Sequence, residues 1–173
     1  MPGTLYVVAT PIGNLEDLTL RAARVLREVD VIAAEDTRRT RTLLARFEIA
    51  TPVTSYFEQN KFRKGPELIR QLLEGKSVAL VTDAGTPGIS DPGFFLVKEA
   101  RAAGIPVVPV PGPSAVAAAL SVAGIPANRF VFEGFLPVKR GRRAARLAAL
   151  RDLETTVVLY EGPHRLLRTL EAI

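Results

Sequence analysis

Short apolar runs and amphipathic segments alternate along this chain. Apolar runs of strand length occupy residues 4–10, 30–34, 53–56, 77–82, 105–110, 129–133 and 155–160. Between the first two runs, Ala22, Val25, Leu26 and Val29 fall at i, i+3, i+4 and i+7, and Thr19 precedes them as a candidate N-cap. Strands that alternate with helices are typical of a mainly parallel sheet covered on both faces. The pattern therefore predicts an α/β fold.

The remaining helices are predicted over residues 37–47, 66–73, 94–103 and 115–123, with two more starting at 139 and 163. Pro66 suits the first turn of its helix, because a residue there needs no intrahelical N–H bond. Gly75 and Gly104 directly follow two of the predicted helices, as helix-ending glycines do.

A stiff, proline-rich segment divides the chain. Three prolines fall within residues 109–113, which predicts a domain boundary. We expect an N-terminal α/β domain over residues 1–112 and the start of a second α/β domain over residues 113–173. The helical pattern runs on to Ile173 without a capping signal, so we expect the second domain to be only partly present.

Composition narrows the class of protein. The chain has 173 residues, no cysteine and a single histidine, His164, which excludes disulfides and argues against a metal site. The chain begins without a leader-like segment, and no apolar stretch is long enough to span a bilayer. We expect a cytoplasmic, metal-free protein. The net charge of +5 suits a polyanionic partner such as RNA, although an arginine-rich composition accounts for it equally well.

Three loops are predicted to meet at one edge of the sheet. Residues 11–17, 83–93 and 111–114 each follow a strand, and parallel strands bring such loops to the edge where ligands bind. The loop 83–93 holds three glycines and two prolines and is longer than most strand-to-helix connections, which favours a ligand site over a plain turn. The loop 11–17 lacks the GxGxxG spacing and is more typical of a turn. Ser114 could cap a helix or meet a ligand.

Charged residues follow two of the predicted strands. Glu35 and Asp36 could accept a proton from a hydroxyl, and Arg38 and Arg39 could hold phosphates. A solvated, self-paired cluster explains these four residues as well. Arg165, after the strand 155–160, is a further candidate for a phosphate contact.

Several segments taken in order resemble the tetrapyrrole methylase superfamily. They are TPIGNLEDLT, AEDTR, LVTDAGTPGISDPG, VPVPGPSA, FEGFLP and LYEGPHRL, and they span nearly the whole chain. Members that act on porphyrin-like rings resemble GxGxGD in the first loop and GGDPxxFG in the second. This chain has TPIGN and DAGTPGIS instead, which is similar to the branch that acts on ribosomal RNA of the small subunit.

The resemblance implies a two-domain fold that binds S-adenosylmethionine and methylates the ribose 2′-hydroxyl of a cytidine in 16S ribosomal RNA. It also implies a homodimer. The implied cofactor contacts are Pro11, Ile12, Asp83, Gly85, Gly88, Ser114, Ala115 and Glu161. Glu35 and Asp36 are then the candidates for the base that takes the hydroxyl proton, and Arg38, Arg39 and Arg165 are the candidates for binding RNA phosphates.

Three other interpretations stay open. A methylase of the same fold could act on a tetrapyrrole precursor, whose carboxylates would also suit a basic pocket. A knotted RNA methyltransferase would need glycine-rich loops near the C-terminus, where this sequence has none. A basic RNA-binding domain without enzymatic activity would leave the loop 83–93 unexplained, and no aromatic stacking platform is visible.

Overall fold

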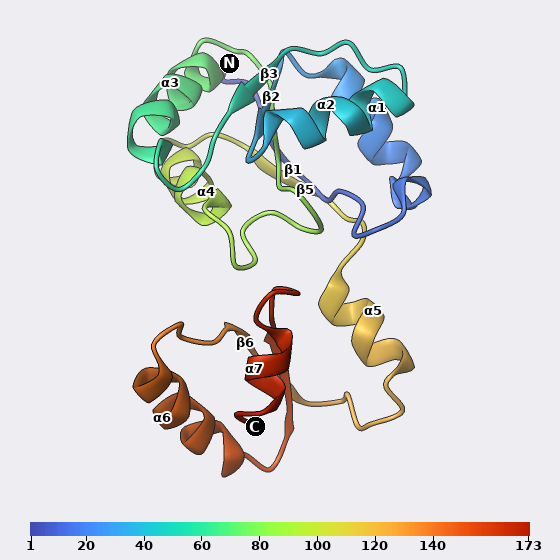
Figure 1. The fold of residues 1–173 in the computed structure, drawn as a ribbon. Coiled ribbons are helices and arrows are strands. Elements are labelled where there is room, and N and C mark those ends of the chain that lie inside the picture. Colours follow the sequence, from blue (N-terminus) through green and yellow to red (C-terminus); the bar gives the residue numbers. More distant parts are fainter. The chain divides into compact units, whose positions relative to one another are not determined.

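The computed structural model describes all residues, 1–173, and divides into two compact units (Figure 1). The larger unit is Met1–Ala115 and the smaller is Val116–Ile173. The sequence-based boundary, between residues 112 and 113, falls three residues before this division. None of the helices has the length and apolar character that crossing a membrane requires.

The larger unit is built on a five-stranded parallel sheet, as the alternating pattern predicted. Its strands are β1 (Leu5–Val8), β2 (Val31–Ala34), β3 (Val53–Ser55), β4 (Val78–Val81) and β5 (Val107–Val110). They are ordered β3-β2-β4-β1-β5, and every neighbouring pair is parallel. The carboxyl ends of all five strands therefore lie at one edge of the sheet.

Helices cover both faces of this sheet (Figure 1). They are α1 (Leu20–Glu28), α2 (Thr37–Arg46), α3 (Lys61–Leu73) and α4 (Gly93–Ala102). Side chains alternate along β4, so that Ala79 and Val81 pack in the core with α1 and α2, whereas Val78 and Leu80 pack in the core with α3 and α4. All four are at most 3% exposed, which explains why this strand reads as an uninterrupted apolar run.

Local signals in the sequence set several helix ends. Thr19 caps α1 by accepting a hydrogen bond from the Ala22 N–H at 3.0 Å, as predicted. Asp36 caps α2 in the same way. The prediction for α3 was wrong at its start, because the helix begins at Lys61 and Pro66 lies inside it. Phe62, in the unpredicted first turn, makes an edge-to-face contact with Phe95 of α4, with ring centroids 5.2 Å apart.

The smaller unit holds a two-stranded parallel sheet of β6 (Phe130–Phe135) and β7 (Thr156–Tyr160). Helix α6 (Arg140–Arg151) connects the two strands, α7 (Leu166–Leu170) follows β7, and α5 (Ala115–Val122) leads in from the larger unit. Leu136 and Leu150 are the only buried hydrophobic residues of the smaller unit. The hydrophobic core of the smaller unit is therefore much smaller than the two cores of the larger unit.

Candidate functional site

Three loops meet at the carboxyl edge of the larger sheet, as the sequence predicted. Thr10, after β1, and Gly85, after β4, form an antiparallel bridge in which each N–H donates to the other's carbonyl, at 2.9 and 3.0 Å. The hydroxyl of Thr86 donates to the carbonyl of Pro113, after β5, at 3.4 Å. A Cβ added at Gly85 would lie 3.6 Å from Ile12 and 3.8 Å from Pro113, so residues of all three loops surround this glycine.

Two buried threonines tie the strand ends together beneath these loops. The Thr10 hydroxyl donates to the Thr82 carbonyl at 3.0 Å, and the Thr82 hydroxyl donates to Glu35 Oε2 at 2.9 Å. Glu35 directly follows β2, which lies beside β4 in the sheet. The order of the strands thus gives the Glu35 carboxylate a fixed position at the edge.

Asp36 and Glu35 follow the same strand but bind different groups. Asp36 Oδ1 accepts the N–H of Arg38 at 2.8 Å, and this bond together with the Arg38 charge lowers the pKa of Asp36. A carboxylate that caps a helix is stabilised in its ionised form, which makes it a weaker base. The two candidate bases are therefore not equivalent.

Asp83 joins the ends of β4 and β2. Its Oδ1 accepts the N–H of Asp36 at 3.0 Å, and its Oδ2 lies 3.3 Å from Arg39 Nη1. The Arg39 side chain is 71% exposed, so this pair contributes little to stability and can exchange for another anion.

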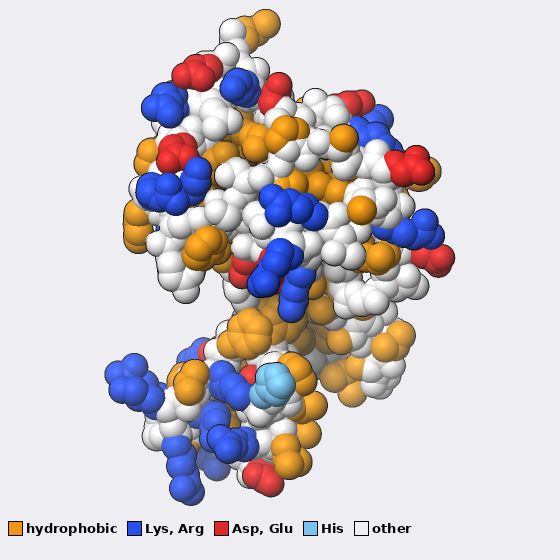
Figure 2. Space-filling view, turned by 45° about the horizontal axis from the view of Figure 1, so that its top comes forward, with side chains coloured by type: hydrophobic (Ala, Val, Ile, Leu, Met, Phe, Trp, Pro, Cys, Tyr) orange, Lys and Arg blue, Asp and Glu red, His pale blue; other side chains and the backbone are white.

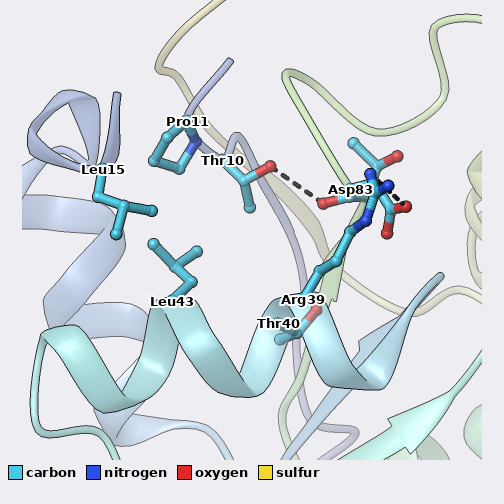
Figure 3. A pocket seen from close by; sticks show the side chains of 8 residues that line it. Thr10, Pro11, Leu15, Arg39, Thr40, Leu43 and Asp83 are labelled. Carbon is cyan, nitrogen blue, oxygen red and sulfur yellow. Dashed lines mark hydrogen bonds and ion pairs between the residues drawn. The ribbon is translucent and has the colours of Figure 1, made fainter. Parts of the chain in front are cut away.

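A small pocket opens beside these groups (Figure 3). Its volume is about 140 Å³, and its walls are Thr10, Pro11, Leu15, Arg39, Thr40, Leu43, Thr82 and Asp83. Pro11, Leu15 and Leu43 lie together at one end, while Arg39 extends from α2 to Asp83 at the other (Figure 3). Small-molecule sites usually measure roughly 300–1,000 Å³, so this pocket suits a fragment of a ligand, with an apolar end and a charged end.

The glycine-rich loop is shaped by Asp91, a residue that the sequence analysis passed over. Its carboxylate accepts the N–H of Gly88 at 2.8 and 2.9 Å and the N–H of Gly93 at 2.6 Å. Gly85 and Gly88 have φ values of +88° and +86°, which side chains rarely adopt. Since Gly85 bonds to Thr10 and Gly88 bonds to Asp91, these N–H groups hold the loop itself rather than point to a ligand.

The candidate residues of the smaller unit bind one another. Glu161 accepts the hydroxyl of Thr169 at 2.6 Å and the N–H of Gly162 at 2.9 Å, and Arg165 lies 3.2 Å from it. The Thr169 hydroxyl and these neighbours lower the pKa of Glu161. Arg165 also donates to the carbonyl of Leu136 at 3.0 Å.

Ser114 and Ala115, the two remaining candidate residues of the larger unit, are half-buried where α5 begins.

The sequence analysis identified the charged residues at the carboxyl edge of the sheet but missed the two threonines. Thr10 and Thr82 each end an apolar run, and a threonine at the end of a strand carries no sequence signal of a special role. The parallel-sheet prediction would have brought both residues to the same edge. Only the strand order shows that Thr82 lies beside Glu35.

Comparison with protein families identifies the fold. The family described as Tetrapyrrole (Corrin/Porphyrin) Methylases matches residues 4–173, which is almost the whole chain. This chain belongs to the tetrapyrrole methylase family. Glu35, Asp83 and the glycine-rich loop therefore lie at the carboxyl edge of a sheet that has the fold of this family.

Closely similar relatives carry one name. The chain is 56% identical over 168 residues to Ribosomal RNA small subunit methyltransferase I of Pseudomonas aeruginosa, and 53% identical over 169 residues to the protein of that name from Halalkalibacterium halodurans. These matches cover 97% and 98% of this chain, but 60% and 58% of the relatives. The chain thus spans about three fifths of the length of these relatives.

Two solved structures of methyltransferase-like architecture share the fold of this chain, as their superpositions show. Uroporphyrin-III-C-methyltransferase from Thermus thermophilus superposes with a TM-score of 0.60 at 26% identity, over 85% of this chain and 74% of that one. Diphthine synthase superposes with a TM-score of 0.74 at 19% identity, over 94% of this chain and 65% of that one. At such identities the likeness supports the architecture and leaves the substrate to other evidence.

Proposed function

We propose that this protein transfers the methyl group of S-adenosylmethionine to a ribose 2′-hydroxyl of a cytidine in 16S ribosomal RNA of the small subunit. The observation that carries the proposal is the 56% identity to a small-subunit ribosomal RNA methyltransferase over 97% of the chain. Enzymes of this fold act on different substrates, so the fold alone would not choose between RNA and a tetrapyrrole.

The residues at the carboxyl edge fit the cofactor chemically. S-adenosylmethionine supplies a methyl group on a positively charged sulfur and carries an ammonium group and a ribose. The Asp83 carboxylate offers acceptors to an ammonium or to ribose hydroxyls, and Pro11 and Ile12 offer apolar surface beside Gly85. Gly88, Ser114, Ala115 and Glu161 complete the proposed contacts.

Glu35 is the better candidate for the base that takes the hydroxyl proton. Thr82 holds one of its oxygens, which fixes the orientation of the carboxylate and leaves the second oxygen to face a substrate. Asp36 keeps its role as the helix cap, where its lowered pKa makes it a poor acceptor. Replacement of Glu35 by glutamine should lower kcat strongly while the cofactor Kd stays close to that of the wild type.

The arginines near this edge are proposed to hold RNA phosphates. Arg38 and Arg39 are 88% and 71% exposed, and their partners Asp36 and Asp83 are carboxylates that a phosphate can replace. Arg165 would contribute through N–H groups that its bonds to Glu161 and Leu136 leave over. We propose no metal in this chemistry, since proton transfer to a carboxylate needs none.

The assembly and the compartment follow from the resemblance to the family. We propose that the protein works as a homodimer in the cytoplasm, where ribosomal RNA is its substrate. Sedimentation velocity of the full-length protein tests the dimer. A sedimenting species with the mass of a single chain throughout the micromolar concentration range would contradict the dimer.

Transfer of labelled methyl from S-adenosylmethionine to small ribosomal subunits that lack native methylation tests the proposed function. We expect label in the RNA, at one linkage that resists alkaline hydrolysis because its ribose 2′-oxygen is blocked. Label on a base would overturn the ribose assignment. Cofactor binding without transfer to RNA would redirect the search to tetrapyrrole precursors, and loss of both would exclude a methyltransferase.

A further inference from the structure

The positive charge of the protein is concentrated in the smaller unit. Residues 116–173 hold nine Lys and Arg against five Asp and Glu, a net charge of +4. Residues 1–115 hold fourteen against thirteen, a net charge of +1. Most of the overall excess of +5 thus comes from a third of the chain. An arginine-rich composition would spread over both units and does not explain this asymmetry.

Helix α6 carries most of this charge. It contains five arginines and no acidic residue, and Lys139 precedes it. Figure 2 shows Lys and Arg side chains gathered on the smaller unit around this helix. Such a concentration of one charge on one element is the electrostatic footprint expected of a surface that meets a polyanion.

Only some of these charges have an acidic partner. Arg146 makes a bidentate pair with Glu133, with both bonds at 2.5 Å, and Arg151 pairs with its neighbour Asp152. Three basic side chains at the start of α6 are exposed and form no ion pair: Lys139, Arg140 and Arg142. Lys139 is the N-cap residue of α6 and the two arginines lie in its first turn; the three residues are called the α6 basic surface.

The stability of the helix does not account for these residues. The first turn of a helix carries partial positive charge, so acidic residues there stabilise it and basic residues destabilise it. Helix α6 has no acidic residue in its first turn and no side-chain cap at Lys139. Basic side chains at this place cost stability unless an anion is bound beside them.

We propose that the α6 basic surface binds backbone phosphates of the RNA substrate, as a second contact area besides the arginines of the larger unit. The proposal rests on the proposed function, because it takes ribosomal RNA as the polyanion. Arginine and lysine contacts to phosphate position an RNA without reading its sequence. The surface therefore raises affinity for the subunit and takes no part in methyl transfer.

The test neutralises the surface in the full-length protein. The variant Lys139→Gln/Arg140→Gln/Arg142→Gln is compared with Lys76→Gln/Arg70→Gln/Arg101→Gln, which removes the same charge. In the control, Lys76 precedes β4, and Arg70 and Arg101 lie in the last turns of α3 and α4, all away from the carboxyl edge. Binding to unmodified small-subunit RNA is measured against salt concentration, together with KM, kcat and the cofactor Kd.

We expect the α6 variant alone to bind RNA more weakly. Each lost phosphate contact lowers the slope of log K against log salt by about 0.7 for single-stranded RNA, so three contacts should lower it by about 2. With this difference in slope, the α6 variant should bind RNA up to about 100-fold more weakly than the wild type at 0.1 M salt. The two affinities should become nearly equal at 1 M salt. The KM for the subunit should rise, while kcat and the cofactor Kd stay unchanged.

The outcomes separate this inference from the proposed function. An α6 variant that binds RNA like the wild type or like the control overturns the inference, even if methyl transfer to RNA is confirmed. A defect seen with assembled subunits and absent with naked RNA also overturns it, because the contact would then be a ribosomal protein. Salt-dependent RNA binding that is lost in the α6 variant, in a protein that transfers no methyl to RNA, supports the inference and rejects the proposed function.

Discussion

Asp36 shows how one side chain can serve the fold at a place where the sequence suggested chemistry. Its carboxylate accepts the Arg38 N–H and begins α2, while its own N–H donates to Asp83. Glu35, one residue earlier, binds a threonine hydroxyl and caps nothing. Substitution of Asp36 should therefore affect mainly stability, whereas substitution of Glu35 should affect mainly turnover.

Removal of the Asp36 cap should destabilise the protein. Asp36→Ala loses the bond to the helix N-terminus and should lower the free energy of unfolding, whereas Asp36→Asn keeps a capping oxygen and should change it little. Urea denaturation at pH 7 measures both. A loss of turnover in a stable Asp36→Asn protein would show that the carboxylate charge itself acts in the reaction.

The pH dependence of the Asp36 cap has a definite sign. Because the bond to Arg38 lowers the pKa of Asp36 below 3.8, the stabilisation is complete above that pH and is lost as the pH falls through the lowered value. The difference in unfolding free energy between the wild type and Asp36→Ala should therefore shrink on acidification below about pH 4. A difference that stays constant down to pH 2 would contradict the ionic part of the cap.

Tyr56 presents the reverse case, a buried polar group that costs stability. Its side chain is 1% exposed and its hydroxyl makes no hydrogen bond. Burial raises its pKa to about 12, and the backbone of Leu96 acts in the opposite direction. Tyr56→Phe should leave the unfolding free energy unchanged or raise it by up to about 1 kcal/mol at pH 7.

The same substitution should remove an alkaline loss of stability. A raised pKa favours the neutral tyrosine in the folded state, so its contribution is complete below pH 10 and is lost as the pH rises from 10 towards 12. The advantage of Tyr56→Phe over the wild type should therefore grow as the pH rises from 10 towards 12, as followed by urea denaturation. A variant that is clearly less stable at pH 7 would mean that the hydroxyl has a partner in solution.

At the scale of elements, the glycine-rich loop depends on a backbone conformation that only glycine adopts readily. Gly85 has a φ of +88°, and both its N–H and its carbonyl form hydrogen bonds with the backbone of Thr10. Gly85→Ala should therefore lower the free energy of unfolding by about 1–2 kcal/mol and weaken cofactor binding, because the loop shifts to relieve the strain.

A helical glycine of the same unit gives the matched control. An added Cβ at Gly65, inside α3, would lie 3.4 Å from the Phe95 ring, which is ordinary contact. Gly65→Ala should thus raise stability by about 0.5–1 kcal/mol and leave cofactor affinity alone. Thermal unfolding and calorimetric titration with the cofactor measure both variants; equal effects at the two positions would argue against the strained loop.

Elements were predictable where a local signal was strong. Thr19 capped its helix as expected, and each predicted strand is present, because hydrophobic periodicity and capping depend on neighbours in sequence. The start of α3 was missed because Pro66 is typical of a first turn, and the contact of Phe62 with Phe95 of another helix cannot be read from neighbouring residues. Asp91 was missed for a similar reason, since its bonds to Gly88 and Gly93 depend on the turn between them.

At the scale of the whole molecule, stability and charge are divided unequally between the two units. Both large cores lie in the larger unit, while Leu136 and Leu150 are the buried hydrophobic residues of the smaller one. The smaller unit exposes Phe135, Leu167 and Leu170 by more than half. We infer that the larger unit folds without the smaller one.

Expression of the two pieces tests this division. A fragment of residues 1–115 should unfold cooperatively and resist proteolysis, because it retains both cores, whereas residues 116–173 alone should give no cooperative transition. Circular dichroism with urea and limited proteolysis measure each fragment. A fragment 1–115 that does not fold would show that the second unit contributes essential packing.

The sequence by itself determined the strands, most of the helices, the parallel sheet and the edge at which its loops meet. Hydrophobic periodicity, caps and turn residues act over a few positions, and they are written in the order of the residues. Its motifs also led to the family that the comparison confirmed.

Only the tertiary structure decided which groups at that edge act on one another. The strand order β3-β2-β4-β1-β5 places Thr82 beside Glu35 and Asp83 beside Asp36, although 47 positions separate each pair along the chain. It also distinguishes the carboxylate that caps a helix from the one that a hydroxyl orients. Such pairings depend on which strands lie side by side and which way each side chain points, and no pattern of neighbouring residues carries that information.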